Sequence, residues 1–194
     1  MSKADNLHDF LQDVSDAIKE KKGSTEPINA QSFSEEIRNL PSGGEVAVFD
    51  KNMEDKTGNG FTEIESCVVA DGVIGISYRA YFGCQSLKHI SLPNTITNFG
   101  IQCFQDCILL TSLVLPSNMS RIQNMVFYGC KALELLDCRN STQIPSLGSA
   151  VFVSGNANLR IVVPDALYDE WIAATNWAAM AGQIIKASEY ESQN

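Results

Sequence analysis

Apolar side chains return at a fixed interval between residues 64 and 145. Tyr81, Phe104 and Phe127 stand 23 residues apart. No single helix or strand gives so long a period, because their patterns repeat every about 3.6 or about 2 residues. The interval therefore predicts a solenoid of stacked coils, each burying its apolar side against the next. The same step separates three further sets: Cys84, Cys107 and Cys130; Leu87, Leu110 and Leu133; Ile90, Leu113 and Leu136.

Each repeat opens on a phrase that predicts a short strand. Its apolar positions follow the spacing L-x-x-L-x-L, the signature of leucine-rich repeats. Side chains alternate between the two faces of a strand, so Ile90 is expected to point inward and His89 outward. Pro93 and Pro116 follow two of these strands directly and should end them. The four copies of the phrase begin at Ile64, Leu87, Leu110 and Leu133.

The remainder of each coil supplies further core positions and a turn. The phrase Cys103-Phe104-Gln105-Asp106-Cys107 and its copies are predicted to form a turn of α- or 3₁₀-helix on the convex side. Stacked coils bury like residues over like, so each ring and each thiol should lie over its counterpart one coil away. Two other sets are expected in the core: Val73, Ile96 and Met119, and Ile76, Phe99 and Ile122.

The 23-residue period breaks after Cys138, and the following residues are expected to terminate the solenoid. Pro145 marks an irregular connection, and Phe152 is interpreted as a displaced aromatic rung. A last alternating strand ends at Pro164, so the solenoid is expected over residues 64–164. Residues 165–187 have helical spacing and two tryptophans, which predicts a helical cap over the open end of the stack. The polar residues 188–194 are expected to fray.

The N-terminal part has a different pattern. Apolar stripes at helical spacing predict helices over 7–22 and 31–40, which together form a helical hairpin appendage over 1–40. We expect this appendage to dock on the solenoid or on another chain, because two short stripes make a small core. Residues 41–63 are interpreted as a linker and a capping hairpin, with Val46 and Val48 alternating like a strand.

With these residues in view, the chain resembles the BspA-like leucine-rich repeat family of bacterial proteins over about residues 64–186. The likeness rests on Tyr78 to Pro93 and its two copies, and on the closing segments Asn158 to Pro164 and Ala173 to Trp177. It implies an α/β solenoid: a leucine-rich-repeat-like, right-handed stack of ~23-residue coils with short strands. It also implies a binding role without catalytic residues. Separately, Asp16 to Asn29 resembles a segment of phage or prophage structural proteins.

The net charge and the hydropathy of the chain limit the classes of partner and the cellular locations that we expect. The net charge is −9 and the pI about 4.6, which argues against nucleic acid and anionic lipid as partners. No apolar run approaches the ~20 residues of a membrane helix, and the N-terminus lacks a secretory signal. The chain is therefore expected to stay in the cytosol or to join a larger particle, with the cell surface left open if a signal has been removed.

The cysteine and histidine residues form no recognisable catalytic or metal-binding motif. The six cysteines fall largely on core positions of the repeat and are interpreted as small buried hydrophobes. There is no CxxC, and no histidine stands near Cys103 and Cys107 to complete a zinc site. His8 and His89 are interpreted as solvated surface residues. We therefore predict no metal, no cofactor and no enzymatic activity.

Two functions remain. The first is a protein-binding or adhesion-type module that uses the outward positions of successive strands, as repeat proteins do. The alternative is a structural subunit of a phage- or prophage-derived particle that docks through residues 1–40. The positions predicted to form the binding face are Ser66, Val68, His89, Ser91, Ser112, Val114, Leu135 and Asp137.

Overall fold

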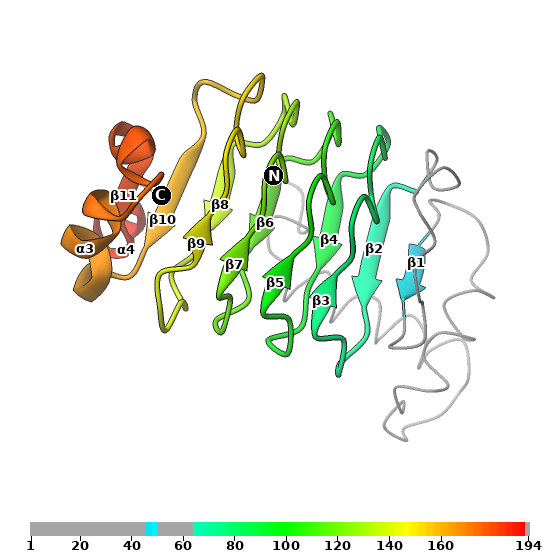
Figure 1. The fold of residues 1–194 in the computed structure, drawn as a ribbon, viewed down its shortest axis with the longest axis horizontal. Helices are drawn as coiled ribbons and strands as arrows, with labels where there is room; N and C mark the ends of the chain where they lie inside the picture. Colours follow the sequence, from blue (N-terminus) through cyan, green and yellow to red (C-terminus); the bar gives the residue numbers. More distant parts are fainter. Residues whose placement is uncertain (1–45, 50–63, 193–194) are drawn as a thin grey trace.

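The computed structural model describes residues 46–49 and 64–192, and Figure 1 shows them as a row of stacked coils that ends in short helices. The predicted helical hairpin over 1–40 lies outside the described residues. So does most of the predicted linker and capping hairpin, from which only 46–49 is described. These segments stay predictions.

One side of the stack contains the predicted strand phrases, together with β1 at one end and β11 at the other. Their strands pair in parallel, with Cys67 opposite Ile90 and Leu113 opposite Leu136. Equivalent inward positions thus meet from coil to coil, which confirms the strand register. The ladder is divided, since β1-β2-β4 and β11-β10-β8-β6 are separate hydrogen-bonded groups. The strands are β1 (Val46–Phe49), β2 (Ser66–Val69), β4 (His89–Ser91), β6 (Ser112–Val114), β8 (Leu135–Asp137), β10 (Arg160–Val163) and β11 (Ile184–Lys186).

A second parallel sheet, which the sequence did not predict, forms another side of each coil. Its strands are two residues long, and their order is β3-β5-β7-β9. Ile76 stands opposite Phe99, and Phe99 opposite Ile122, so the predicted core set occupies one register. Strands this short show no measurable alternation in a sequence. They are β3 (Gly75–Ile76), β5 (Asn98–Phe99), β7 (Arg121–Ile122) and β9 (Ser146–Leu147).

The aromatic phrases form hydrogen-bonded turns over 78–83, 101–106, 124–129 and 149–154. The predicted turn of α- or 3₁₀-helix is therefore wrong. Left-handed residues recur at the second and sixth positions of each turn and rotate its peptide groups out of a helical path. Second-position residues are Arg79 (φ 55°), Gln102 (60°), Met125 (57°) and Ala150 (55°), and sixth-position residues are Gly83 (68°), Asp106 (59°), Gly129 (72°) and Ser154 (58°).

Alternate peptide groups of each turn bond to the next coil. The N–H groups of Arg79, Tyr81 and Gly83 donate to carbonyls of the following turn at 3.0, 2.7 and 2.8 Å. Gln102, Phe104 and Asp106 donate in the same way, as do Met125, Phe127 and Gly129. Three columns of hydrogen-bonded peptide groups therefore run along the stack, and every group in them points its N–H toward the C-terminal end.

The rings inside these turns form one column. Tyr81 stacks on Phe104 with ring centroids 5.1 Å apart, and Phe104 on Phe127 at 5.7 Å. Phe127 stacks on Phe152 at 5.7 Å, which confirms that Phe152 is the displaced rung. The last coil is longer by two residues, since Leu136 pairs with Ile161 rather than with a residue 23 positions on.

All six cysteines are free and buried, as predicted for core positions. The Sγ atoms of Cys107 and Cys130 donate to the carbonyls of Tyr81 and Phe104 in the preceding coil, both at 3.1 Å. Burial disfavours the thiolate and raises the pKa of Cys84 to about 11. The same cause raises the pKa of Cys67 and of Cys130 to about 12.

These thiols predict a loss of stability at alkaline pH. Each neutral buried thiol stabilises the fold fully below its ordinary pKa of 9.0, and that contribution declines as the pH rises toward 11 for Cys84. We expect the free energy of unfolding to fall by on the order of 1 kcal/mol per thiol per pH unit in this window. Urea unfolding between about pH 7 and about pH 10.5 measures it. A Cys84→Ala variant should show a shallower slope, and a flat profile in the wild type would contradict the prediction.

The segment after β10 folds against the end of the stack (Figure 1). It contains η1 (Asp165–Leu167), α3 (Tyr168–Ala173), η2 (Ala178–Gln183), β11 and α4 (Ala187–Glu191). Trp171 and Trp177 are fully buried there, with ring centroids 5.4 Å apart. The prediction of a helical segment missed β11, which extends the sheet by pairing with β10. The prediction of fraying is wrong for 188–191, which lie in α4.

Candidate binding face

The outward positions of the strands lie in two columns across the sheet. Ser66 stands opposite His89, and Ser112 opposite Leu135, in the first column. Val68 stands opposite Ser91, and Val114 opposite Asp137, in the second. The structure thus brings the predicted face residues together as neighbours within each ladder.

The middle of this surface is accessible, and we call it the open face. His89 and Val114 are exposed, with 38% of Val114 accessible, and the other members are half-buried. Alternating inward residues, here Ile90 and Leu113, anchor these side chains to the core. The open face consists of His89, Ser91, Ser112, Val114 and Leu135.

Two predicted face residues are buried, which corrects their assignment to an exposed surface. Val68 in β2 retains 9% of its accessible area, and Asp137 in β8 retains 7%. Asp137 is buried because Arg139 folds over it. The Nη2 and Nε atoms of Arg139 donate to the two carboxylate oxygens of Asp137 at 2.7 and 3.0 Å. Ser66, next to the buried Val68, is half-buried.

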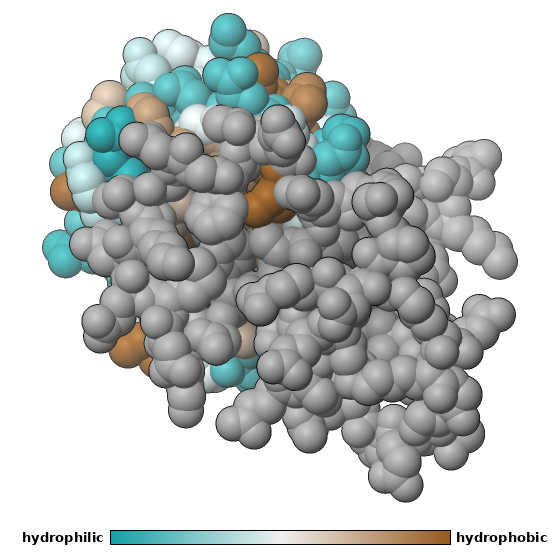
Figure 2. All heavy atoms as spheres, turned by 90° about the vertical axis from the view of Figure 1, so that its right-hand side faces the viewer, coloured by the Kyte–Doolittle hydropathy of each residue, from teal (hydrophilic) through white to brown (hydrophobic). Residues whose placement is uncertain are grey.

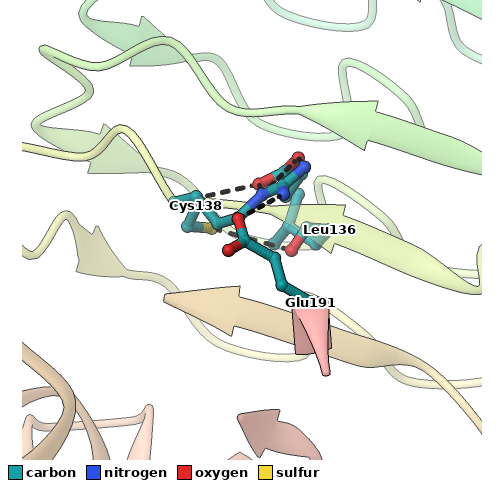
Figure 3. A network of polar contacts seen from close by, with 5 residues as sticks. Leu136, Cys138 and Glu191 are labelled. Carbon is teal, nitrogen blue, oxygen red and sulfur yellow. Dashed lines mark hydrogen bonds and ion pairs between the residues drawn. The ribbon is translucent and has the colours of Figure 1, made fainter. Parts of the chain in front are cut away.

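A charged and aromatic cluster closes the C-terminal side of the face. Arg139 also bonds to Glu191 at 3.3 Å, and its guanidinium lies 5.6 Å from the ring centroid of Tyr190. Arg160 contacts the same ring at 5.1 Å. Figure 3 shows Glu191 extending from α4 toward the strand that carries Leu136. The hydrogen bond to Asp137 raises the pKa of Arg139 above its ordinary value.

Sequence reasoning did not find this cluster. Arg139 and Glu191 are 52 positions apart, and neither belongs to the repeated phrase. The only available signal is the basic character of one segment and the acidic character of the other, and many other charged residues of the chain could form the same pair.

Figure 2 shows the opposite end of the stack, where the visible described surface is mostly hydrophilic with separate hydrophobic patches.

The described residues contain neither a metal-binding group nor a membrane-spanning helix. Within residues 46–49 and 64–192, no group of three or more His, Cys, Asp or Glu residues is placed to hold a metal ion. Among the same residues, no helix has the length and apolar character needed to span a membrane. The open face offers hydroxyls, an imidazole and aliphatic carbons, which suit contacts with another surface.

Comparison with known families decides the kind of repeat. The sequence model described as BspA type leucine rich repeat region, in six copies, matches residues 52–168. The chain belongs to the BspA type leucine rich repeat family. The match begins before residue 64, where the repeats were predicted to start.

This BspA type chain shares its fold with a solved leucine-rich repeat structure. It is similar to a leucine-rich repeat protein from Bacteroides ovatus at 19% identity and a TM-score of 0.50, over 64% of this chain and 30% of that one. A T. pallidum leucine rich repeat protein is 21% identical with a TM-score of 0.39, over 62% of this chain and 63% of that one. The BspA type chain thus spans less than two thirds of either protein. No protein of curated function matches it.

The family assignment agrees with one of the two predicted functions, the binding role. BspA type repeats are typically binding modules and are often associated with cell surfaces, which agrees with a binding role for this BspA type chain. The matched region does not include residues 16–29, so their likeness to phage proteins stays a prediction. The family match gives no support to the phage-particle alternative.

Proposed function

We propose that this protein is a non-catalytic protein-binding module whose partner lies against the open face. The observation that carries the proposal is the accessible strip across β4, β6 and β8, bordered by the buried Val68 and Asp137. A rigid scaffold presents this strip, because inward neighbours of each residue are packed in the core. Such a surface loses little conformational entropy when a partner binds.

The composition of the open face favours a protein partner. Val114 on β6 and Leu135 on β8 provide aliphatic area, and His89, Ser91 and Ser112 provide polar groups on the same face. Protein interfaces combine apolar and polar area in this way. The net charge of −9 disfavours polyanionic partners.

A charge placed in the centre of the face should abolish binding without unfolding the protein. Val114→Glu adds a carboxylate that a partner would have to desolvate, and we expect at least about tenfold weaker capture. The free energy of unfolding, measured with urea, should fall by about 1 kcal/mol or less, because the side chain points outward and the cost comes from the like charge of Asp137 on the neighbouring strand. Pull-down with the full chain, followed by mass spectrometry, measures capture.

Ile101→Glu is the matched control. Ile101 is 37% exposed, close to the 38% of Val114, but lies in a turn away from the strands. A partner that is lost with Val114→Glu and kept with Ile101→Glu supports the proposal. Proteins retained equally by both variants would overturn it, and unfolding of Val114→Glu would show that the residue faces the core.

A further inference from the structure

Within the part of the chain that the structure describes, the three columns of peptide hydrogen bonds end at the last turn. The carbonyls of Ser149, Val151 and Val153 accept from the preceding coil at 3.0 Å each. The N–H groups that follow them, on Ala150, Phe152 and Ser154, have no acceptor among the described residues. In every earlier turn, the equivalent three N–H groups donate to the next coil. With respect to the described residues, the last turn therefore presents three N–H donors without an acceptor where a further coil would lie.

These donors border a groove of about 490 Å³. One wall is the last turn and its flanks, residues 147–157, and the other contains Asn176, Ala179, Met180 and Gln183. The volume falls within the roughly 300–1,000 Å³ typical of ligand sites. None of the residues that line the groove is charged, although the protein contains 14 Lys and Arg residues and 23 Asp and Glu residues. The groove therefore suits an uncharged occupant.

The orientation of the columns strengthens these donors. Every peptide group in a column points its N–H the same way, so the dipoles add as they do along a helix. Chained hydrogen bonds also polarise one another, and the terminal N–H groups are the positive ends of three such chains. The groove is thus poised for acceptor oxygens arranged like those of Ser149, Val151 and Val153.

We propose that this groove binds an uncharged polypeptide segment of a partner protein, folded in the same turn as residues 149–154, through three of its alternate carbonyl oxygens. The inter-coil interface supplies the pattern, since three successive turns already pair in this way. The bound segment carries small side chains, because Trp177 lies 6.2 Å from Phe152 and occupies the place of the next ring. This mode adds backbone to an open edge, and it is separate from the open face.

Amide NMR of the full chain tests the proposal. The probe is a peptide with blocked ends that carries the sequence of residues 147–156 with the change Phe152→Ala. Without peptide, the amides of Ala150, Phe152 and Ser154 should exchange with solvent faster than those of Phe127 and Gly129. With peptide, the first three should shift and exchange more slowly, because they become hydrogen-bonded.

Two variants of adjacent alanines locate the binding site. Ala178 and Ala179 are both exposed in η2, and only Ala179 lines the groove. Ala179→Arg should abolish the shifts, and Ala178→Arg should leave them unchanged. Fast exchange that the peptide does not alter at millimolar concentration, or three amides already protected in the free chain, would overturn the proposal. Protection that grows with the concentration of the chain alone would assign the edge to a second copy instead of a partner.

Discussion

Phe127→Ala is expected to destabilise the protein by about 3–5 kcal/mol, the range for removing a large buried aromatic side chain. Phe127 is fully buried, and it stacks between Phe104 and Phe152 with centroid distances of 5.7 Å on both sides. Phe99 makes a T-shaped contact with the same ring, with ring centroids 6.1 Å apart. The substitution removes three aromatic contacts and opens a cavity. Each aromatic pair contributes about 0.5–1.5 kcal/mol to stability in addition to the contribution of its buried area.

Urea unfolding measures this loss, with Tyr128→Ala as the control. Tyr128 is the next residue in the same turn, but it is only half-buried. We expect its substitution to cost about 1 kcal/mol or less. Equal losses for the two variants would mean that the ring column does not hold the coils together.

Trp177→Ala is expected to cost a similar amount, about 3–5 kcal/mol. The side chain is fully buried, and its Nε1 donates to the carbonyl of Pro145 at 2.7 Å. The ring contacts both Trp171 and Phe152, so it joins the C-terminal segment to the end of the ring column. Its loss leaves a cavity and an unpaired buried carbonyl, and the thermal midpoint should fall accordingly.

A comparison of the two tryptophans separates packing from hydrogen bonding. Trp171 is equally buried, but its Nε1 has no acceptor among the described residues. Trp177→Phe should therefore cost about 1–3 kcal/mol more than Trp171→Phe, since it alone orphans a carbonyl. Equal losses would show that the bond to Pro145 contributes nothing to stability.

The parts of the fold that repeat at a fixed step could be predicted from the sequence. Phe104 and Cys107 have counterparts at the same distance on either side, and stacking places these residues in columns. The left-handed turns could not be predicted in this way, because Arg79 and Gln102 are residue types that rarely adopt positive φ. Neighbouring coils hold them there through hydrogen bonds that no local pattern records.

The binding face was predictable only in its middle. Alternation correctly placed Val114 outward, because it depends on neighbours within one strand. Burial of Asp137 depends on Arg139, whose own position depends on contacts with Glu191 and Tyr190 from the distant end of the chain. A surface prediction from strand alternation says which way a residue points, and tertiary contacts decide whether solvent reaches it.

The longer last coil shows where this architecture accepts change. Leu136 pairs with Ile161, 25 positions on, and Ile122 pairs with Leu147, also 25 positions on. The two extra residues therefore lie in the connection between β8 and β9, while the rings above and below remain stacked. Insertions at this corner leave the interior unaltered, so related chains can acquire longer loops there, beside the strands, without redesigning their core.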